Sequence, residues 1–225
     1  MEEEIDKKEE ENYKITYHLL KEKSYKLSEL KEIINESYFL KILERSCKSP
    51  LIDKFKRLIE NKNLFLESLF HIKSNEQILY IQRAGFFTTP ELLIAYLMEV
   101  EDKMIVFIPF HLFLHFSLSK YRELLLQTLQ TFSEDLKFKK EDISEKIEYP
   151  LFDFLAFPTK ESKFEKPFYH VEVKASKSRN FRLTSAQRKD MEKMVGKVGI
   201  ILAIVDVHNP EEIHVKYFEP VLEYQ

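Results

Sequence analysis

The chain has 225 residues, of which 44% are hydrophobic, so it can bury the core of one sizeable domain or of two small ones. Charged residues make up 32% but nearly cancel to a formal net charge of -3, which neither requires nor excludes a nucleic-acid partner. The single cysteine, Cys47, excludes an intrachain disulfide framework, a cysteine-based zinc site and a four-thiolate iron–sulfur cluster, and it favours a reducing, intracellular (cytoplasmic) setting.

The first half of the chain has the pattern of a helical protein. Residues 1–12, "MEEEIDKKEEEN", are acidic and polar, and we expect a disordered start there rather than a secretory signal. From residue 13 to about residue 133 the apolar spacing predicts helices. Capping residues or a proline mark four helix starts: Ser28, Ser49-Pro50, Ser74 with Gln77 ahead of Gly85, and Thr89-Pro90. The segment around Gly85 has the outline of a helix-turn-helix, but its second helix is acidic and apolar, so we interpret it as a packing or dimerisation scaffold.

Residues 104–118, "MIVFIPFHLFLHFSL", are apolar enough to raise the question of a membrane span. The segment is about five residues short of the ~20 that a helix needs to cross a bilayer, and it contains Pro109. We therefore predict buried core and no membrane association. His111 and His115 lie one helical turn apart, as in a zinc pair, but without a third ligand we expect two histidines in a helix core.

After residue 133 the pattern changes to short apolar runs, which predict strands. The four runs are "PLFDFLAFP", "PFYHVEVKAS", "VGIILAIVDVH" and "EEIHVKYFEP". Between the second and the third, Thr184 and Gln187 form a capping box and Gly196 ends a helix. The prediction is a helical domain at residues 13–116, for scaffolding, dimerisation or substrate recognition, followed by an α/β (α+β) domain at residues 117–225. With 3 glycines in the whole chain, glycine-rich nucleotide loops are excluded and no nucleotide cofactor is expected.

The strand "YHVEVKAS" places charged residues inside an apolar run. With the two-residue period of a strand, His170, Glu172 and Lys174 face one side. Asp153 interrupts the preceding apolar run, so antiparallel pairing would bring it close to Glu172. Two close carboxylates repel each other unless a cation lies between them, and Mg²⁺, or Mn²⁺ in its place, binds such oxygens. The carbonyl of Val173 is a further candidate ligand, and Lys174 would orient or deprotonate a water and stabilise charge on a phosphate.

Asp153, followed by Glu172-Val173-Lys174 on the next strand, resembles the PD-(D/E)xK signature of restriction-endonuclease-like nucleases and Holliday-junction resolvases, with Phe152 in place of the proline. "VEVKAS" followed by "FRLTSAQRKDM" is similar to the strand and helix of Mrr-like modules, in which a Gln or Glu often lies early in the helix. The resemblance covers residues 120–218 and implies a restriction-endonuclease-like mixed sheet core flanked by helices. It also implies an Mg²⁺-dependent nuclease that cuts DNA with an activated water.

The resemblance adds two candidate catalytic residues, each with a plainer alternative. Many such nucleases carry a glutamate on the helix before the sheet, and Glu123 is the candidate here, although it can equally be a solvent-facing helix residue. Gln187 is the second candidate, and its alternative role is the capping box with Thr184. For Glu172 and Lys174 themselves, the alternative is a structural ion pair in a buried or edge strand.

Positive charge gathers near this strand. Residues 174–197 hold eight basic residues against two acidic ones, as a surface for the phosphate backbone would require. The residues expected to contact nucleic acid are Lys177, Ser178, Arg179, Asn180, Arg182 and Arg188. A homodimer would supply two sites for cutting two strands. The competing hypotheses are a catalytically inactive nucleic-acid-binding or assembly protein, and a helical interaction domain whose sheet is purely structural.

Overall fold

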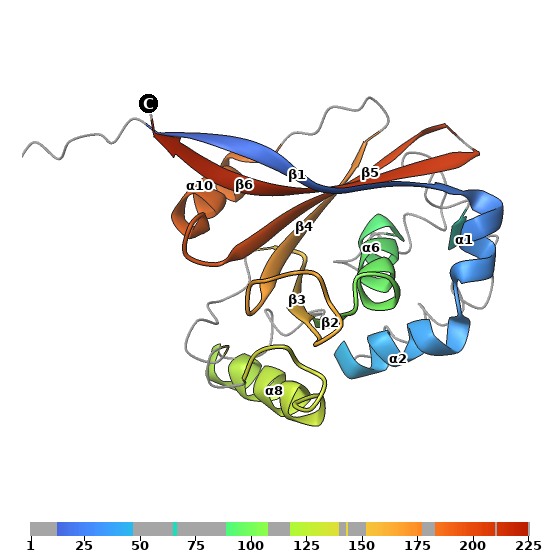
Figure 1. The fold of residues 1–225 in the computed structure, drawn as a ribbon, viewed down its shortest axis with the longest axis horizontal. Coiled ribbons are helices and arrows are strands. Elements are labelled where there is room, and N and C mark those ends of the chain that lie inside the picture. The colour runs from blue at the N-terminus through green and yellow to red at the C-terminus, as the bar shows by residue number, and fades with distance from the viewer. Residues whose placement is uncertain are drawn as a thin grey trace, which may run out of the picture.

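A six-stranded sheet runs through the part of the chain that the structure describes (Figure 1). The computed structural model describes residues 13–46, 65–66, 89–107, 118–139, 143, 152–176, 183–209 and 211–224. The strands are β1 (Tyr13–Lys26), β2 (Met104–Phe107), β3 (Phe154–Pro158), β4 (Tyr169–Ser176), β5 (Gly199–Asn209) and β6 (Glu212–Tyr224). Their order is β1-β6-β5-β4-β3-β2, which leaves β1 and β2 at the two edges of the sheet.

The sheet consists of two antiparallel runs joined by a parallel step. β2, β3 and β4 form one antiparallel run, and β5, β6 and β1 form the other. β4 and β5 pair parallel, which requires a crossover, and helix α10 (Ser185–Met194) provides it. The predicted capping box is confirmed: Thr184 N–H donates to Gln187 Oε1 at 2.9 Å, and Gln187 N–H donates to Thr184 Oγ1 at 3.2 Å. Gly196, with a φ of 82°, follows the end of this helix as predicted.

The two faces of the sheet carry separate layers of helices. On β4, Val171 and Val173 face a core shared with α1 (Leu27–Ile33), α2 (Glu36–Ser46) and α6 (Thr89–Val100). His170, Glu172 and Lys174 point to the opposite side, called the α10 face below. Apolar clusters under α8 (Leu118–Thr131) and α10 cover parts of that face. Figure 1 shows α6 and α10 on opposite sides of β4.

The strand predictions after residue 133 are confirmed, because each of the four apolar runs coincides with a strand, although β5 and β6 extend past their runs to Asn209 and Tyr224. The prediction of a helical N-terminal region is wrong. β1 and β2 are strands of the same sheet and lie where the apolar spacing predicted helices. The predicted fold class, a helical region followed by a separate restriction-endonuclease-like core, is therefore replaced by a mixed α/β structure around one sheet.

The error at β1 has a physical cause. "YKITYHLLKEKSYK" carries closely spaced charges and leucines that suit an exposed helix, but β1 pairs with β6 from Tyr13↔Tyr224 to Lys26↔Glu212. Backbone pairing with a distant segment overrides local preference. The helix predicted after Ser28 is also divided: α1 begins at Leu27, and a new helix begins after Asn35, whose Oδ1 accepts the Tyr38 N–H at 2.9 Å.

Other predictions for the first half fall partly outside the described residues. Those that do are the disordered start at residues 1–12, the helix starts at Ser49-Pro50 and Ser74 with Gln77, Gly85, and His111 and His115. Thr89 begins α6 as predicted. Residues 104–107 are buried as strand β2. Within the described ranges, no helix combines the length and the apolar character needed to cross a membrane. The domain division at residue 116 stays a prediction, although strands from both sides of it share one sheet.

A charged network fastens the edge strand β1 to the turn after α6. Lys21 Nζ lies 2.5 Å from Asp102 Oδ1, and Lys23 Nζ lies 2.8 Å from Glu101 Oε1. Tyr25, which is 1% exposed, donates its hydroxyl to Glu101 Oε2 at 2.6 Å. Because a bond to a charged partner inside a buried cluster is costly to lose, Tyr25 should be the strongest of these links.

We predict that Tyr25→Phe lowers the free energy of unfolding by about 1–3 kcal/mol, because Glu101 loses a buried donor. Urea denaturation of the purified chain measures the change. Tyr38→Phe is the matched control, since Tyr38 is 39% exposed, and it should leave the midpoint nearly unchanged. Equal midpoints for the two variants would show that the network does not hold β1 in place.

Candidate functional site

Asp153 and Glu172 occupy facing positions of the β3–β4 pair. The register pairs Phe154 with Val171 and Leu155 with His170, and one further step in the same register sets Asp153 across from Glu172. Asp153 Oδ2 accepts the backbone N–H of Val173 at 2.7 Å. This bond holds the Asp153 carboxylate beside β4, just before the first residue of β3.

Glu172 is held from two sides. Its side chain is 2% exposed, and its Oε1 accepts from Lys174 Nζ at 2.5 Å and from Gln187 Nε2. Gln187 lies in the first turn of α10 and uses its amide oxygen for the capping box and its amide nitrogen for Glu172. The two roles considered for Gln187, helix cap and contact with Glu172, are therefore compatible.

Burial raises the proton affinity of both acids, and repulsion from Glu172 raises that of Asp153 further. Burial, and then the charge of Glu172, raise the pKa of Asp153 to about 7. Burial also raises the pKa of Glu172, although the Lys174 ammonium opposes this shift. A positive ion between the carboxylates would relieve both causes, because it stabilises the ionised forms.

The remaining oxygens are placed to receive such an ion. In the described part of the chain, Asp153 Oδ1 and Glu172 Oε2 have no hydrogen-bond partner. The Val173 carbonyl points to the same side of β4 as its N–H, and that N–H is bonded to Asp153. Two carboxylates, one carbonyl, waters and substrate phosphate match the way proteins bind Mg²⁺. The described residues contain no cluster of three or more His, Cys, Asp or Glu side chains arranged for a metal, so water and substrate would complete the coordination.

His170 lies on the same face of β4 but has a packing role. It is 0% exposed, and its ring lies 6.0 Å from that of Phe152 and 5.5 Å from that of Phe168, measured between centroids. Among the described residues, neither ring nitrogen has a hydrogen-bond partner, and burial lowers the pKa of His170 to about 4. The imidazole is therefore neutral near pH 7 and forms no hydrogen bond with the carboxylates of Asp153 and Glu172.

The structure brings together five of the predicted site residues and separates another from them. Those brought together are Asp153, Glu172, Val173, Lys174 and Gln187. Glu123 is exposed on α8, where it accepts from Gln127 at 3.2 Å, so its position matches the solvent-facing alternative. Arg188 is exposed on α10. The predicted contacts Lys177, Ser178, Arg179, Asn180 and Arg182 lie outside the described residues. The catalytic and binding roles of all these residues stay predictions.

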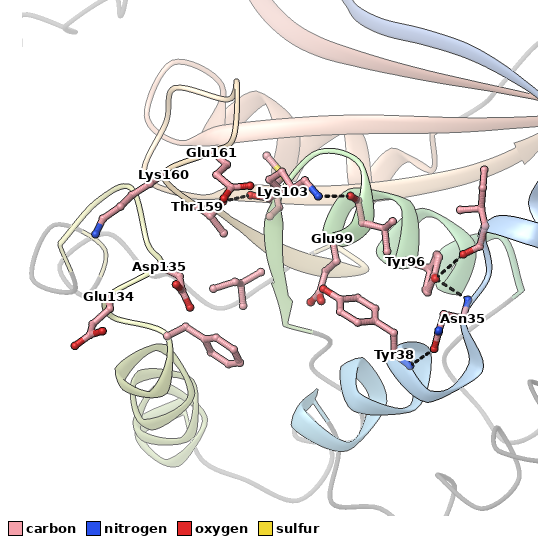
Figure 2. Close-up of a pocket in the computed structure, with 15 residues that line it drawn as sticks. Asn35, Tyr38, Tyr96, Glu99, Lys103, Glu134, Asp135, Thr159, Lys160 and Glu161 are labelled. Carbon is pink, nitrogen blue, oxygen red and sulfur yellow. Dashed lines mark hydrogen bonds between the residues drawn. The ribbon is translucent and has the colours of Figure 1, made fainter.

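The sequence did not reveal three further features, a buried acid–histidine pair and two cavities. Asp206 is buried on β5 and bonds to His208 Nδ1 at 2.7 Å, and its one sequence signal is a lone acid within an apolar run. A cavity of about 620 Å³ lies beside β2 (Figure 2). A second cavity, of about 830 Å³, lies beside β1 and includes Lys21 and Asp102. Neither cavity is lined by Asp153 or Glu172.

We predict that Asp153 contributes a loss of stability as the pH rises from about 4 to about 7, because it ionises near 3.8 in the unfolded chain and near 7 in the folded one. In that window the folded chain keeps the Asp153 proton and the unfolded chain has lost it, whereas buried His170, with its pKa lowered to about 4, contributes in the opposite sense. Asp153→Asn should therefore make the free energy of unfolding change more favourably with rising pH than in the wild type, and saturating Mg²⁺ should shift the wild-type slope in the same direction. Urea titrations across the window measure both effects, and an Asp153→Asn slope as steep as that of the wild type would contradict the assignment.

Comparisons of the chain with known protein families, with curated proteins and with solved structures found no match. The chemistry of the site therefore rests on its own geometry.

Proposed function

We propose that the Asp153, Glu172 and Lys174 cluster is the active centre of an Mg²⁺-dependent nuclease that hydrolyses phosphodiester bonds in DNA. The observation that supports this most directly is the facing pair of carboxylates, each with one oxygen free of hydrogen bonds in the described part of the chain, beside an amine. The resemblance of Asp153 and Glu172-Val173-Lys174 to the PD-(D/E)xK signature supports the same chemistry.

Asp153, Glu172 and the Val173 carbonyl would hold the cation. Mg²⁺ bound there would polarise the phosphate and lower the pKa of an attacking water. The Val173 N–H keeps Asp153 at the end of β3, and Gln187 keeps Glu172 in place. These positions are preorganised, because they are fixed by the sheet register and by the first turn of a helix.

Lys174 would act on the substrate rather than on the cation. Its amine now lies 2.5 Å from Glu172 Oε1, and its side chain is 24% exposed, so it can reach a phosphate from the same position. When a cation takes over part of the Glu172 charge, the ammonium becomes available to orient the attacking water and to stabilise the negative charge that develops on phosphorus oxygens.

The first turns of α10 supply a basic surface next to the cluster. Arg188 directly follows Gln187, and Arg188, Lys189, Lys193 and Lys197 are exposed. The Lys193 ammonium lies 3.9 Å from the Asp190 carboxylate, which partly offsets its positive charge. Arg188 and Lys189 directly follow Gln187, the helix residue that contacts Glu172. We infer that the DNA backbone runs along this part of α10, because exposed arginine and lysine bind phosphates without regard to sequence.

One observation favours a second candidate, a nucleic-acid-binding or assembly protein without catalysis. Glu172 Oε1 already accepts from Lys174 and from Gln187, so the pair can persist as a structural ion pair. In that case Mn²⁺ would not bind and DNA binding would not depend on a metal.

We predict that Glu172→Gln and Lys174→Ala each lower DNA cleavage by at least about 100-fold in Mg²⁺ or Mn²⁺, because they remove a cation ligand and the group beside the phosphate. Gel assays with linear and branched DNA measure the rate. Lys163→Ala and Glu211→Gln, at exposed positions, are the matched controls and should cleave at the wild-type rate. A wild-type chain that cuts no DNA, or variants that cut it normally, would contradict the proposal.

We predict that reversing charge in Arg188→Glu with Lys189→Glu weakens DNA binding by at least about tenfold and makes the affinity less dependent on salt. Fluorescence anisotropy at several salt concentrations measures both quantities. Lys41→Glu, an exposed change on α2, is the control and should alter neither. Equal salt slopes for all three proteins would mean that the DNA does not contact α10.

A further inference from the structure

The sheet register sets one transverse row of residues beside the carboxylate pair. Glu172 of β4 pairs with Leu202 of β5. Leu202 pairs with Phe218 of β6, which in turn pairs with Leu19 of β1. Paired residues of neighbouring strands carry their side chains on the same face of a sheet, and Glu172 points to the α10 face. The row therefore crosses the α10 face from the carboxylate pair to the sheet edge at β1.

The sequence neighbours of these residues agree with this face. Tyr217, next to Phe218, lies in the core shared with α6. Phe218 then points the other way, because successive side chains of a strand alternate between the two faces. Tyr17, two residues before Leu19, donates its hydroxyl to Met191 Sδ of α10 at 3.9 Å. Leu19 therefore shares the α10 face with Tyr17 and Phe218.

The row becomes more accessible towards the sheet edge. Leu202 is 0% exposed, Phe218 is half-buried, and Leu19 is 51% exposed, the highest value for a large apolar side chain in the described part of the chain. With strands about 4.8 Å apart, Phe218 lies about 10 Å from Glu172 across the sheet and Leu19 about 14 Å from it. Phe218 and Leu19, called the platform below, thus place an apolar surface on the face that carries the carboxylates.

Positively charged side chains lie near both ends of the row. Lys174 lies two residues beyond the row on β4 and faces the same side. Burial raises the pKa of Tyr17 and the Arg188 charge opposes the rise, so the guanidinium of Arg188 lies near β1. Lys216 of β6 lies 2.7 Å from Glu22 of β1, and this pair adds no net charge between the two ends.

A single strand of nucleic acid matches this combination of an apolar surface and flanking cations. Apolar and aromatic side chains can contact the faces of bases only where the bases are unpaired, because in a duplex the bases stack on one another. The phosphates of the same segment would meet the cations at the two ends of the row. A duplex hides its base faces and would use the charges alone.

We propose that Phe218 and Leu19 form a platform for unpaired bases, which guides a single-stranded segment of the DNA from the carboxylate pair towards the β1 edge of the sheet. This inference rests on the proposed nuclease function, and it narrows the substrate to DNA that contains a single-stranded segment. The distance of about 10 Å between Glu172 and Phe218 corresponds to about three nucleotides at a stacked rise of about 3.4 Å. A partner protein at this surface would instead leave Phe218 untouched by DNA.

The test uses the emission of an introduced tryptophan in the full chain, which has no tryptophan of its own. Phe218→Trp places this reporter in the platform, and Ca²⁺ replaces Mg²⁺ so that a cation balances the carboxylates. We expect a short single-stranded DNA to quench the emission saturably by at least about one-third, because a base stacks on the indole, and the matching duplex to quench it far less. Phe164→Trp is the matched control, since Phe164 is also half-buried but packs against the core on the α6 side, and neither DNA should quench it.

Binding measured by anisotropy gives a second readout. Phe218→Ala should weaken single-strand binding by at least about fivefold and change duplex binding by less than about twofold, because one stacking contact is lost. Phe218→Tyr keeps the ring and should bind as the wild type does. Urea midpoints show whether each variant is folded.

The outcomes separate this inference from the nuclease proposal. The platform is overturned if single-stranded DNA does not quench Phe218→Trp, if the duplex quenches it equally, or if Phe164→Trp is quenched as strongly. Cleavage of DNA without such quenching would keep the nuclease and remove the platform. Quenching in a chain that cuts no DNA would contradict the nuclease and leave Phe218 and Leu19 as a single-strand binding surface.

Discussion

The register between β3 and β4 is the constraint on which the functional account depends. It sets Asp153 across from Glu172, and the Val173 N–H then fixes the aspartate at 2.7 Å. A slip of one residue would turn Glu172 and Lys174 to the opposite face, into the apolar core shared with α6. Hydrophobic burial of Val171 and Val173 on that side therefore keeps the charged residues together on the α10 face. The apolar core thus selects the β3–β4 register, and the geometry of the site depends on that register.

The chain buries other charges as well, but those are satisfied differently. In the network at β1, Lys21 and Lys23 balance Glu101 and Asp102, and the lysines bind the acids from a separate strand. At the β3–β4 pair, two acids face one lysine, and burial raises the pKa of both acids. A buried group with more acids than cations is a functional candidate, whereas a balanced network is a structural link. This contrast distinguishes the two sites in physical terms.

Much of the second half could be predicted from the sequence, and much of the first half could not. β3 to β6 are short apolar runs with clear boundaries, and the Thr184–Gln187 capping box marks α10 by local chemistry alone. The closeness of Asp153 and Glu172 could be predicted from the two-residue period of the strands and from the polar turn between them. β1 was misread because its charged, leucine-containing sequence is strand only through pairing with β6, some two hundred residues away along the chain. The contact of Gln187 with Glu172 was likewise beyond local patterns, since it depends on how the crossover helix packs on the sheet.

The protein thus has acidic residues around the cavity beside β2 and basic residues on α10, and the Asp153–Glu172 pair lies on the α10 face of the sheet. A crystal grown with Mn²⁺ tests the central claim most directly, through an anomalous difference map. We expect a peak within about 2.5 Å of a carboxylate oxygen from both Asp153 and Glu172, with Lys174 beside it. A map without a peak there, and with Lys174 still bonded to Glu172, would contradict the metal centre and leave a structural ion pair in its place.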